Sequence, residues 1–243
     1  MNPEPPARRI GCPLCAGRQQ CLLGRLSKER RDDWMPLVTE RPTRKGERLL
    51  QQGQWAHSFQ IVKTGTVLLL RSGEDGVERP IGVFGAGLPL GTTALVEQPA
   101  PLSCRALTAG RVCEVAIASG TQPGLLDAEF LRGLAQSYAQ TNARLADWAS
   151  IVRIRGTAGQ LAATLLQLAK LQNSSLVRLP SHIVLADLLS TTRETIARTL
   201  RQLELRDGLV RRDRWHCEIQ HEALTSLACG RLPASRTDGP RPS

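Results

Sequence analysis

The sequence predicts an α+β fold in three parts: a β jelly-roll barrel over residues 25–121, a long helix over 122–153 and a winged helix-turn-helix over 154–229. Three observations support this prediction. Residues 41–118 alternate short apolar runs with glycine-marked turns, as a protein of many short strands does. The long-helix segment repeats apolar side chains at the helical period. Residues 178–220 combine two short amphipathic helices, a tight turn and a basic outward face.

The composition favours an acidic macromolecular partner. The chain has 243 residues, enough for two modest domains with proper cores, and a net charge of +10 at pH 7. A pI of about 10.0 suits a polyanion, and double-stranded DNA is the first candidate. A basic protein on a membrane surface is the competing interpretation, although no stretch is long and apolar enough to span a bilayer. The N-terminus lacks a signal-peptide core, so we expect a cytoplasmic protein whose seven cysteines are reduced, metal-binding or buried.

Residues 1–24 form a cysteine-rich segment with Cys12, Cys15 and Cys21 in the pattern C-x2-C-x5-C. Glycine and proline beside them allow the backbone to fold around a small object. Three thiolates within ten positions indicate a metal or an iron–sulfur cluster, with a structural zinc site as the alternative. An unliganded tail with accidental cysteines is the third interpretation. Three ligands are incomplete for either centre, so a fourth must come from elsewhere in the chain.

Residues 25–40 are predicted to form a short helix. Ser27 is a suitable N-cap, and Leu26, Trp34 and Leu37 are expected to face inward. This helix would connect the cysteine-rich segment to the barrel.

From residue 41 onward, about eight strands with glycine-marked turns and no long helix between them predict a β-barrel or jelly roll. A hairpin is expected, with its turn at Glu74-Asp75-Gly76. The clearest strand candidates are FQIVKTG, TVLLLRS, PIGVFG and VCEVAIA.

Residues 122–153 predict one long helix that begins near Gln122-Pro123 or at Asp127. It is too long to be covered by a small barrel alone, so we expect it to form a dimerisation seam. Packing on its own barrel only is the alternative. After a break near Arg155-Gly156, residues 157–170 predict another amphipathic helix. The apolar positions of the long helix are Leu125, Phe130, Leu134, Tyr138, Leu145 and Ile151 or Val152.

Residues 178–220 predict a helix-turn-helix followed by a wing. The turn between the two helices has Ser190 where glycine is frequent. A second turn at Asp207-Gly208 precedes LVRRDRWHCEI, which predicts a two-stranded wing with arginines near its tip. The inward residues expected of the first helix are Ile183, Leu185 and Leu188 or Leu189.

The second helix carries the chemistry expected of a DNA reader. Thr192 is a good N-cap for a helix that begins at Arg193, and arginine can donate a bidentate pair to guanine while glutamate accepts from cytosine. Arg193, Glu194 and Arg198 can all point into a major groove. A solvated amphipathic helix would explain the charges but not the cap, turn, wing and basic excess together. Its predicted apolar face is Ile196, Leu200 and Leu203. The predicted DNA-contacting residues are Thr192, Arg193, Glu194, Ala197, Arg198, Arg201 and Arg212.

This arrangement resembles the Crp/Fnr family of bacterial transcription regulators, over most of the chain from about Cys12 to Ala228. The most specific piece is RETIARTLRQLELRDGLV, which is similar to the family's recognition helix, with its Arg-Glu-x-x-x-Arg pattern on Arg193, Glu194 and Arg198. The resemblance implies a cyclic-nucleotide-binding-like barrel. It also implies a homodimer that binds a palindromic operator and contacts RNA polymerase.

Two branches of the family compete. The cyclic-nucleotide branch has a Gly-Glu pair and an Arg-Ser pair that hold the ribose and the phosphate. Here Gly91 is followed by Thr92, and Ser103-Cys104 stands where the Arg-Ser pair would be. Arg105 lies one or two positions away, so a shifted register would still offer a cation. Without the carboxylate and with the arginine displaced, we expect no cyclic-nucleotide binding of the usual type.

The oxygen-sensing branch has an N-terminal cysteine triplet plus one cysteine in the barrel. Its triplet spacing is matched by Cys12, Cys15 and Cys21, and its Val-Cys-Glu-apolar strand by Val112-Cys113-Glu114-Val115. The resemblance implies that these four hold one [4Fe–4S] cluster per subunit. Cys104, expected on a neighbouring strand, is the rival fourth ligand, and Cys113 is preferred for its sequence context.

The resulting hypothesis is a regulator in which oxygen, nitric oxide or redox state acts through the cluster on dimerisation and promoter binding. A regulator of the same fold with zinc, haem or another small effector is the alternative. An enzyme is not expected, because no Ser/His/Asp ordering, phosphate loop or paired carboxylates are found. Activation versus repression, the operator and the target genes stay open, and Ala197, where the oxygen-sensing branch usually has Ser, leaves the half-site open. Cys217 and Cys229 are expected to be structural, and the tail 230–243 is expected to be disordered. His57, in a barrel loop, is expected to be solvated, with haem ligation as the alternative. Surface or phosphate-contact roles, and not catalysis, are expected of His182, His216 and His221.

Overall fold

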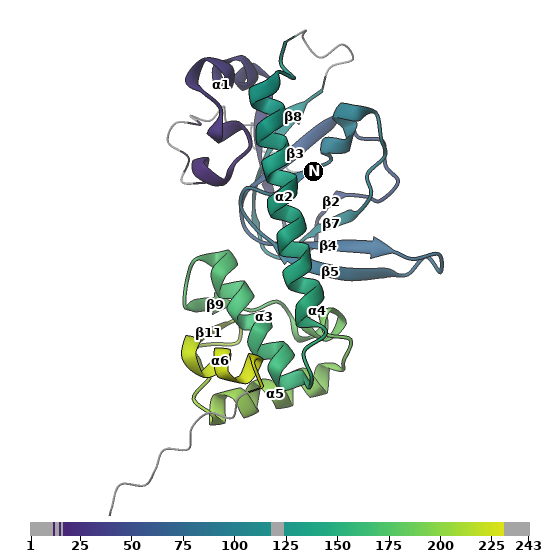
Figure 1. Cartoon of the computed structure of the whole chain (residues 1–243). Coiled ribbons are helices and arrows are strands. Elements are labelled where there is room, and N and C mark those ends of the chain that lie inside the picture. The colour runs from purple at the N-terminus through teal and green to yellow at the C-terminus, as the bar shows by residue number, and fades with distance from the viewer. Residues whose placement is uncertain (1–11, 13–14, 16, 118–123, 231–243) are drawn as a thin grey trace, which may run out of the picture. The chain divides into compact units, whose positions relative to one another are not determined.

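The computed structural model describes residues 12, 15, 17–117 and 124–230 (Figure 1). The chain divides into two compact units, residues 1–148 and 149–243, so the division falls inside the long helix α2. The expected disordered tail after Gly230 and the earlier of the two expected starts of the long helix, at Gln122-Pro123, lie outside the described residues.

The first unit contains two four-stranded antiparallel sheets, ordered β1-β8-β3-β6 and β2-β7-β4-β5. Strands that are distant in sequence pair within each sheet, as the predicted jelly roll requires, and the expectation of about eight strands is confirmed. The predicted hairpin is β4–β5, where Gly76 N donates to Gly73 O at 3.0 Å. The strands are β1 Val38–Thr43, β2 Arg48–Leu50, β3 Ser58–Thr64, β4 Val67–Ser72, β5 Glu78–Phe84, β6 Pro89–Leu90, β7 Ser103–Ala106 and β8 Gly110–Ala116.

An aromatic cluster joins the barrel to the helices around it. Trp34 stacks on Phe130 with ring centroids 4.6 Å apart and meets Phe59 edge-on at 6.0 Å. All three rings are buried, and such pairs add to the stability that area burial provides. The cluster therefore holds α1, β3 and α2 together at one end of the barrel.

The predicted helix over 25–40 is shorter than expected. Helix α1 covers Lys28–Trp34, a 3-10 turn η4 follows over Met35–Leu37, and strand β1 already begins at Val38. Pro36 in that turn has no N–H to continue a helical ladder, which explains the early end. The predicted N-cap position of Ser27 is confirmed, although its hydroxyl does not cap the helix and instead donates to Glu129 on α2 at 3.0 Å. Two further 3-10 turns precede α1, η2 Arg18–Gln20 and η3 Leu23–Arg25.

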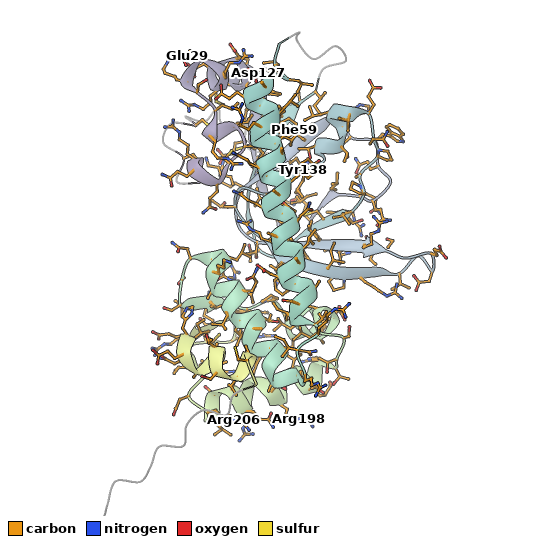
Figure 2. The ribbon with its side chains drawn as sticks, viewed as in Figure 1. Glu29, Phe59, Asp127, Tyr138, Arg198 and Arg206 are labelled. Atoms are coloured by element: carbon orange, nitrogen blue, oxygen red, sulfur yellow. The ribbon has the colours of Figure 1, made fainter. Side chains whose placement is uncertain are left out.

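Helix α2 covers Ala128–Ile151 and begins at the later of the two expected starts. The carboxylate of Asp127 accepts from Phe130 N at 2.9 Å and caps the helix. Two side-chain hydrogen bonds fasten α2 to the barrel further along: Tyr138 OH lies 2.7 Å from Thr92 Oγ1, and Trp148 Nε1 donates to Val83 O at 3.1 Å. Figure 2 shows Asp127 and Tyr138 along this helix.

The second unit packs α3 against α5 and α6 beside a three-stranded sheet ordered β10-β11-β9. The helix expected over 157–170 and the two-stranded wing are both confirmed, and β9 is a third strand that the sequence pattern did not reveal. Gly156, at φ +81°, marks the predicted break. The elements are α3 Thr157–Gln172, β9 Leu176–Arg178, α4 His182–Leu188, α5 Arg193–Leu205, β10 Leu209–Arg211, β11 His216–Ile219 and α6 His221–Ala228.

The inward faces of the two short helices are mostly as predicted. Leu185, Leu188 and Leu189 are buried, and so are all three apolar residues expected of α5. The prediction for Ile183 is wrong, because its side chain is 58% exposed. Residues two apart on an α-helix point about 200° apart, so Ile183 and Leu185 cannot share one face.

Candidate functional site

Four cysteines line one pocket in the first unit. Cys12, Cys15 and Cys21 come from the N-terminal segment and Cys113 comes from β8, so the fold joins residues that a whole barrel separates in sequence. The empty volume of the pocket, its open side included, is about 470 Å³. The remaining lining residues are Gly17, Arg18, Met35, Val38, Ile61, Val62, Lys63 and Gly87.

Short backbone turns shape the cysteine segment. Cys15 N donates to Cys12 O at 3.2 Å, and Cys21 N donates to Arg18 O at 3.2 Å. The backbone at Gly24 lies so close to Arg18 that a Cβ at Gly24 would collide with the Arg18 carbonyl oxygen. The segment therefore curls back on itself and presents its thiols to one side.

A glycine in the barrel lets this segment lie directly against it. Gly87 is in the β5–β6 turn at φ +86°, and a Cβ there would be only 2.5 Å from the carbonyl oxygen of Gln20. Both the positive φ and the close approach favour glycine. Gly87 thus allows the cysteine segment to lie close to the barrel.

The thiols of the pocket influence one another electrostatically. The pKa of Cys113 is raised to about 12, chiefly by burial, and the Cys21 and Cys15 thiols contribute to the rise while Lys63 opposes it. Burial also raises the pKa of Cys21, with Cys12 and Cys15 as neighbours that add to the effect. These mutual contributions place the four sulfur groups within electrostatic reach of one another, in agreement with the shared pocket.

Cys104, the rival fourth ligand, is elsewhere. It is on β7, paired with Leu50 and Leu69 in the other sheet, so the expectation of a strand neighbouring that of Cys113 is wrong. Burial alone raises the pKa of Cys104 to about 12, and no other cysteine contributes. Of the two, only Cys113 shares the pocket of the triplet.

The two remaining cysteines are in the second unit. Cys217 on β11 is buried, which suits its expected structural role, whereas Cys229 after α6 is exposed. Neither lines the pocket of the triplet.

The donor set fits a thiolate-bound group. The pocket lining contains no carboxylate or histidine, and thiolates favour iron–sulfur clusters and zinc. Within the described residues, no three His, Cys, Asp or Glu side chains already form a finished metal site. The pocket therefore gathers four cysteine thiols, but among the described residues these thiols are not yet arranged as the coordination sphere of a metal ion.

The positions that would hold a cyclic nucleotide have partners inside the barrel. Thr92 is buried and is hydrogen-bonded to Tyr138, and the Ser103 hydroxyl accepts from Gln52 N at 3.0 Å. The displaced Arg105 donates to the Glu78 carboxylate at 3.1 Å. Arg105 is therefore paired with an acidic side chain.

In the second unit, α5 presents the predicted basic surface. Thr192 Oγ1 accepts from Thr195 N at 3.2 Å, which confirms the predicted cap. Arg193, Arg198 and Arg201 are exposed and make no ion pair with any residue that the structure describes. Figure 2 shows Arg198 projecting outward from α5. The exposed Glu194 and the half-buried Ala197 are on the same helix.

The turn before α5 keeps its usual left-handed residue, although that residue is a serine and not a glycine. Ser190 adopts φ +51°, the left-handed conformation in which glycine is usual. Thr191 N donates to Ala186 O at 2.9 Å and closes the turn. The motif keeps its geometry at some conformational cost.

One arginine of the wing that is predicted to contact DNA has an acidic partner in the structure. Arg212, expected to contact DNA, is paired with Glu218, its Nε lying 2.9 Å from a carboxylate oxygen. Arg214 lies over the ring of Trp215 at 4.9 Å from the centroid. An aromatic residue beside a wing-tip arginine was visible in the sequence, but Trp215 was not among the predicted site residues. Trp215 is partly exposed and contacts Arg214 through a cation–π interaction.

Comparison with known proteins identifies both units. Residues 40–119 match the cyclic nucleotide-binding domain, and residues 159–227 match the Crp-like helix-turn-helix domain. No curated protein sequence matches the chain significantly. Among solved structures, FixK2 from Bradyrhizobium japonicum is 22% identical with a TM-score of 0.66, over 82% of this chain and 99% of that one.

Two further structures share this fold. The c-di-GMP-responsive global regulator CLP from Xanthomonas campestris is 20% identical with a TM-score of 0.64, over 80% of this chain and 100% of that one. A CRP-family transcriptional regulator from Thermus thermophilus, TTHB099, is 19% identical with a TM-score of 0.63, over 80% and 100%. At these identities the likeness establishes the fold.

A β-barrel of the cyclic nucleotide-binding type together with a Crp-like helix-turn-helix defines a DNA-binding transcriptional regulator. The two matched domains cover more than half of the chain, and the whole-chain fold agrees with them. The chain belongs to the Crp/Fnr family. In the part of the chain that the structure describes, no helix has the length and apolar character needed to cross a membrane.

Proposed function

We propose that this regulator controls its binding to DNA through a [4Fe–4S] cluster held by Cys12, Cys15, Cys21 and Cys113. The observation that carries the proposal is that these four thiols, and no other predicted ligands, line one pocket. When bound, the cluster supplies a centre that oxygen or nitric oxide can destroy, which makes the pocket a sensor. The thiols themselves must lose their protons to act as ligands.

The cysteine segment is connected to helix α2 by its next residues. Arg25 Nη2 donates to Ser137 Oγ at 2.7 Å, and Ser27 N donates to the Glu129 carboxylate at 2.6 Å. Arg30 Nη2 donates to Gly124 O at 2.7 Å, just before the helix. Leu22, Leu23 and Leu26 share one hydrophobic core with Phe130 of α2. A change in how the cysteines are held therefore reaches α2 through contacts already present.

Helix α2 offers a face for a second copy of this chain. Between residues 128 and 148, exposed residues that are mostly small or apolar recur three or four positions apart, the spacing of a helix–helix seam. Leu131 is 50% exposed on this face. A two-fold dimer through α2 would present two α5 helices to half-sites about one DNA turn apart. The face consists of Ala128, Leu131, Ala135, Tyr138, Ala139, Asn142 and Ala146.

On the DNA, α5 supplies the base contacts. Arg198 would donate to guanine and Glu194 would accept from cytosine, together reading a G·C pair in each half-site. Arg193 and Arg201 would contact a base or phosphates, where positive charge fixes the register of the protein. A promoter-bound dimer of this kind would also contact RNA polymerase.

The deciding experiment is the purification of the full chain without oxygen. We expect a visible absorption band with iron and sulfide in equal amounts, both lost on admission of air. Cys21→Ala and Cys113→Ala should abolish the band, whereas Cys104→Ala should retain it. DNA affinity, measured at one fixed salt concentration, should fall on exposure to air.

The same experiment distinguishes the iron–sulfur cluster from the alternative of a zinc site. Zinc is also held by four thiolates, so a regulator of the same fold with a zinc site would use the same pocket. A colourless protein that contains zinc, or no metal, would refute the cluster and leave the DNA-binding regulator intact.

A further inference from the structure

A buried arginine of α1 lacks an acidic partner. The side chain of Arg31 is only 4% exposed, and its Nη1 donates to Leu26 O at 3.3 Å. Its Nε is buried without a hydrogen-bond partner. Among the residues that the structure describes, no carboxylate lies within ion-pair distance of this guanidinium.

Such a charge is costly to bury alone. Guanidinium groups inside proteins are normally paired with an anion, since the desolvation penalty otherwise exceeds the gain from packing. The barrel follows this rule elsewhere: Glu40, also buried, is paired with both Lys63 and Arg111. Arg31 departs from it, because no residue that the structure describes supplies its counter-charge.

The position of Arg31 indicates where that counter-charge lies. Arg31 lies four positions before Met35, a residue of the pocket lining, and its guanidinium donates to Leu26 O, five positions after Cys21. Two other cations, Arg18 and Lys63, line the cysteine pocket itself. Among the described residues of that lining, the thiols are the only groups that can become anions, so Arg31 lies close to a site whose negative charge would come from bound thiolates.

We propose that Arg31 is a positioning residue that supplies the buried positive charge needed to hold an anionic four-thiolate complex in the pocket. The inference rests on the proposed function and adds the charge requirement of the site. Four thiolates around a divalent core, whether Zn²⁺, Co²⁺ or [4Fe–4S]²⁺, leave a complex of net negative charge. Arg31 is paired only when that complex is present.

The test uses the full chain, reduced and metal-free, titrated with Co²⁺ under nitrogen. The absorption of Co²⁺ bound to thiolates reports the dissociation constant directly. Arg31→Met should weaken binding about tenfold, the size of one charge interaction in a partly screened site. Arg31→Lys should retain most of the affinity, because it keeps the charge.

A matched control removes a charge elsewhere in the same unit. Arg71, on β4 in the other sheet, is exposed and donates to Pro101 O at 2.6 Å. Arg71→Met changes the net charge equally and should leave Co²⁺ binding unchanged. A loss of affinity in both variants would overturn the assignment to Arg31, because it would reflect overall charge.

Thermal unfolding of the metal-free protein supplies the second readout. If the charge of Arg31 is uncompensated without the bound complex, Arg31→Met should raise the melting temperature of the metal-free protein while it weakens Co²⁺ binding. An arginine with a merely structural role would show a lower melting temperature and unaltered binding, which would overturn the inference. A wild-type protein that binds neither Co²⁺ nor a cluster would instead refute the proposed function itself, and the role of Arg31 with it.

Discussion

The cysteine pocket and the recognition surface are built in opposite ways. The pocket takes Cys21 and Cys113 from segments far apart in sequence and half-buries both, which raises the pKa of each thiol. The surface takes Arg193, Glu194 and Arg198 from little more than one turn of α5 and leaves them exposed. Ligand binding in the pocket therefore depends on long-range packing, whereas DNA binding depends directly on individual side chains.

The strongest prediction concerns the choice of the fourth ligand. Cys113→Ser should abolish cluster loading, measured as iron and sulfide per chain, because it removes one donor from the pocket. Cys104→Ser is the matched control, because it makes the same substitution at a buried thiol in the other sheet. Loss of loading in Cys104→Ser with retention in Cys113→Ser would reverse the assignment.

Acid should weaken metal binding to the pocket. The pKa values of Cys12, Cys21 and Cys113 are raised, so these thiols are protonated at neutral pH and release protons on binding. The Co²⁺ affinity should therefore rise by about tenfold per pH unit for each thiol that is deprotonated, between roughly pH 6 and 8. A pH-independent dissociation constant would contradict this.

The same raised pKa values predict how the metal-free protein responds to alkali. A group with a raised pKa stabilises the fold fully below its ordinary value and loses that contribution as pH rises through the folded value. Stability should therefore be intact below about pH 9 and decline as pH approaches the value of about 12 of Cys113 and Cys104. Denaturant unfolding of the metal-free protein at several pH values tests this expectation.

On the recognition surface, Arg198→Ala should lower affinity for the specific operator about 10- to 100-fold, the value of a bidentate base contact. Loading of the pocket should not change. Arg212→Ala should have a smaller effect, since Arg212 is already paired with Glu218. Fluorescence anisotropy at fixed salt measures both, and equal losses would indicate that α5 has no special role in reading bases.

Gly87→Ala should disturb the pocket without touching a ligand. The added methyl would press on Gln20 in the cysteine segment, and Co²⁺ affinity should fall several-fold. Gly76→Ala is the control, because Gly76 also has a positive φ, +71°, but nothing within 4 Å of a Cβ. Both variants should lose about 1 kcal/mol of stability from backbone strain, whereas only Gly87→Ala should lose metal affinity.

The smallest expected effect is on the turn before α5. Ser190→Gly should stabilise the protein by roughly 0.5–1 kcal/mol, since it relieves a left-handed serine. The melting temperature should rise slightly, and operator affinity should stay the same. A lower melting temperature would indicate that the serine side chain stabilises the turn.

Features encoded by neighbouring residues were predictable. The Thr192 cap, the buried face of α5, the β4–β5 hairpin and the break at Gly156 each depend on contacts within a few positions. Local residue spacing therefore predicts these features. The one error, the inward orientation predicted for Ile183, is itself inconsistent with the helical period, because Ile183 and Leu185 are two positions apart.

The features that the sequence did not predict depend on packing between segments that are distant in sequence. The choice of Cys113 over Cys104 follows from the order of strands in two sheets. The isolation of Arg31 is similar: in the sequence it is one of several charged residues between Lys28 and Asp33, with nothing to mark it as buried. A sequence pattern shows which side chains a segment contains and with what periodicity they recur along a helix or strand. Which of them meet across the barrel, and which charge is left without a partner, follows from tertiary contacts between segments that local periodicity does not relate.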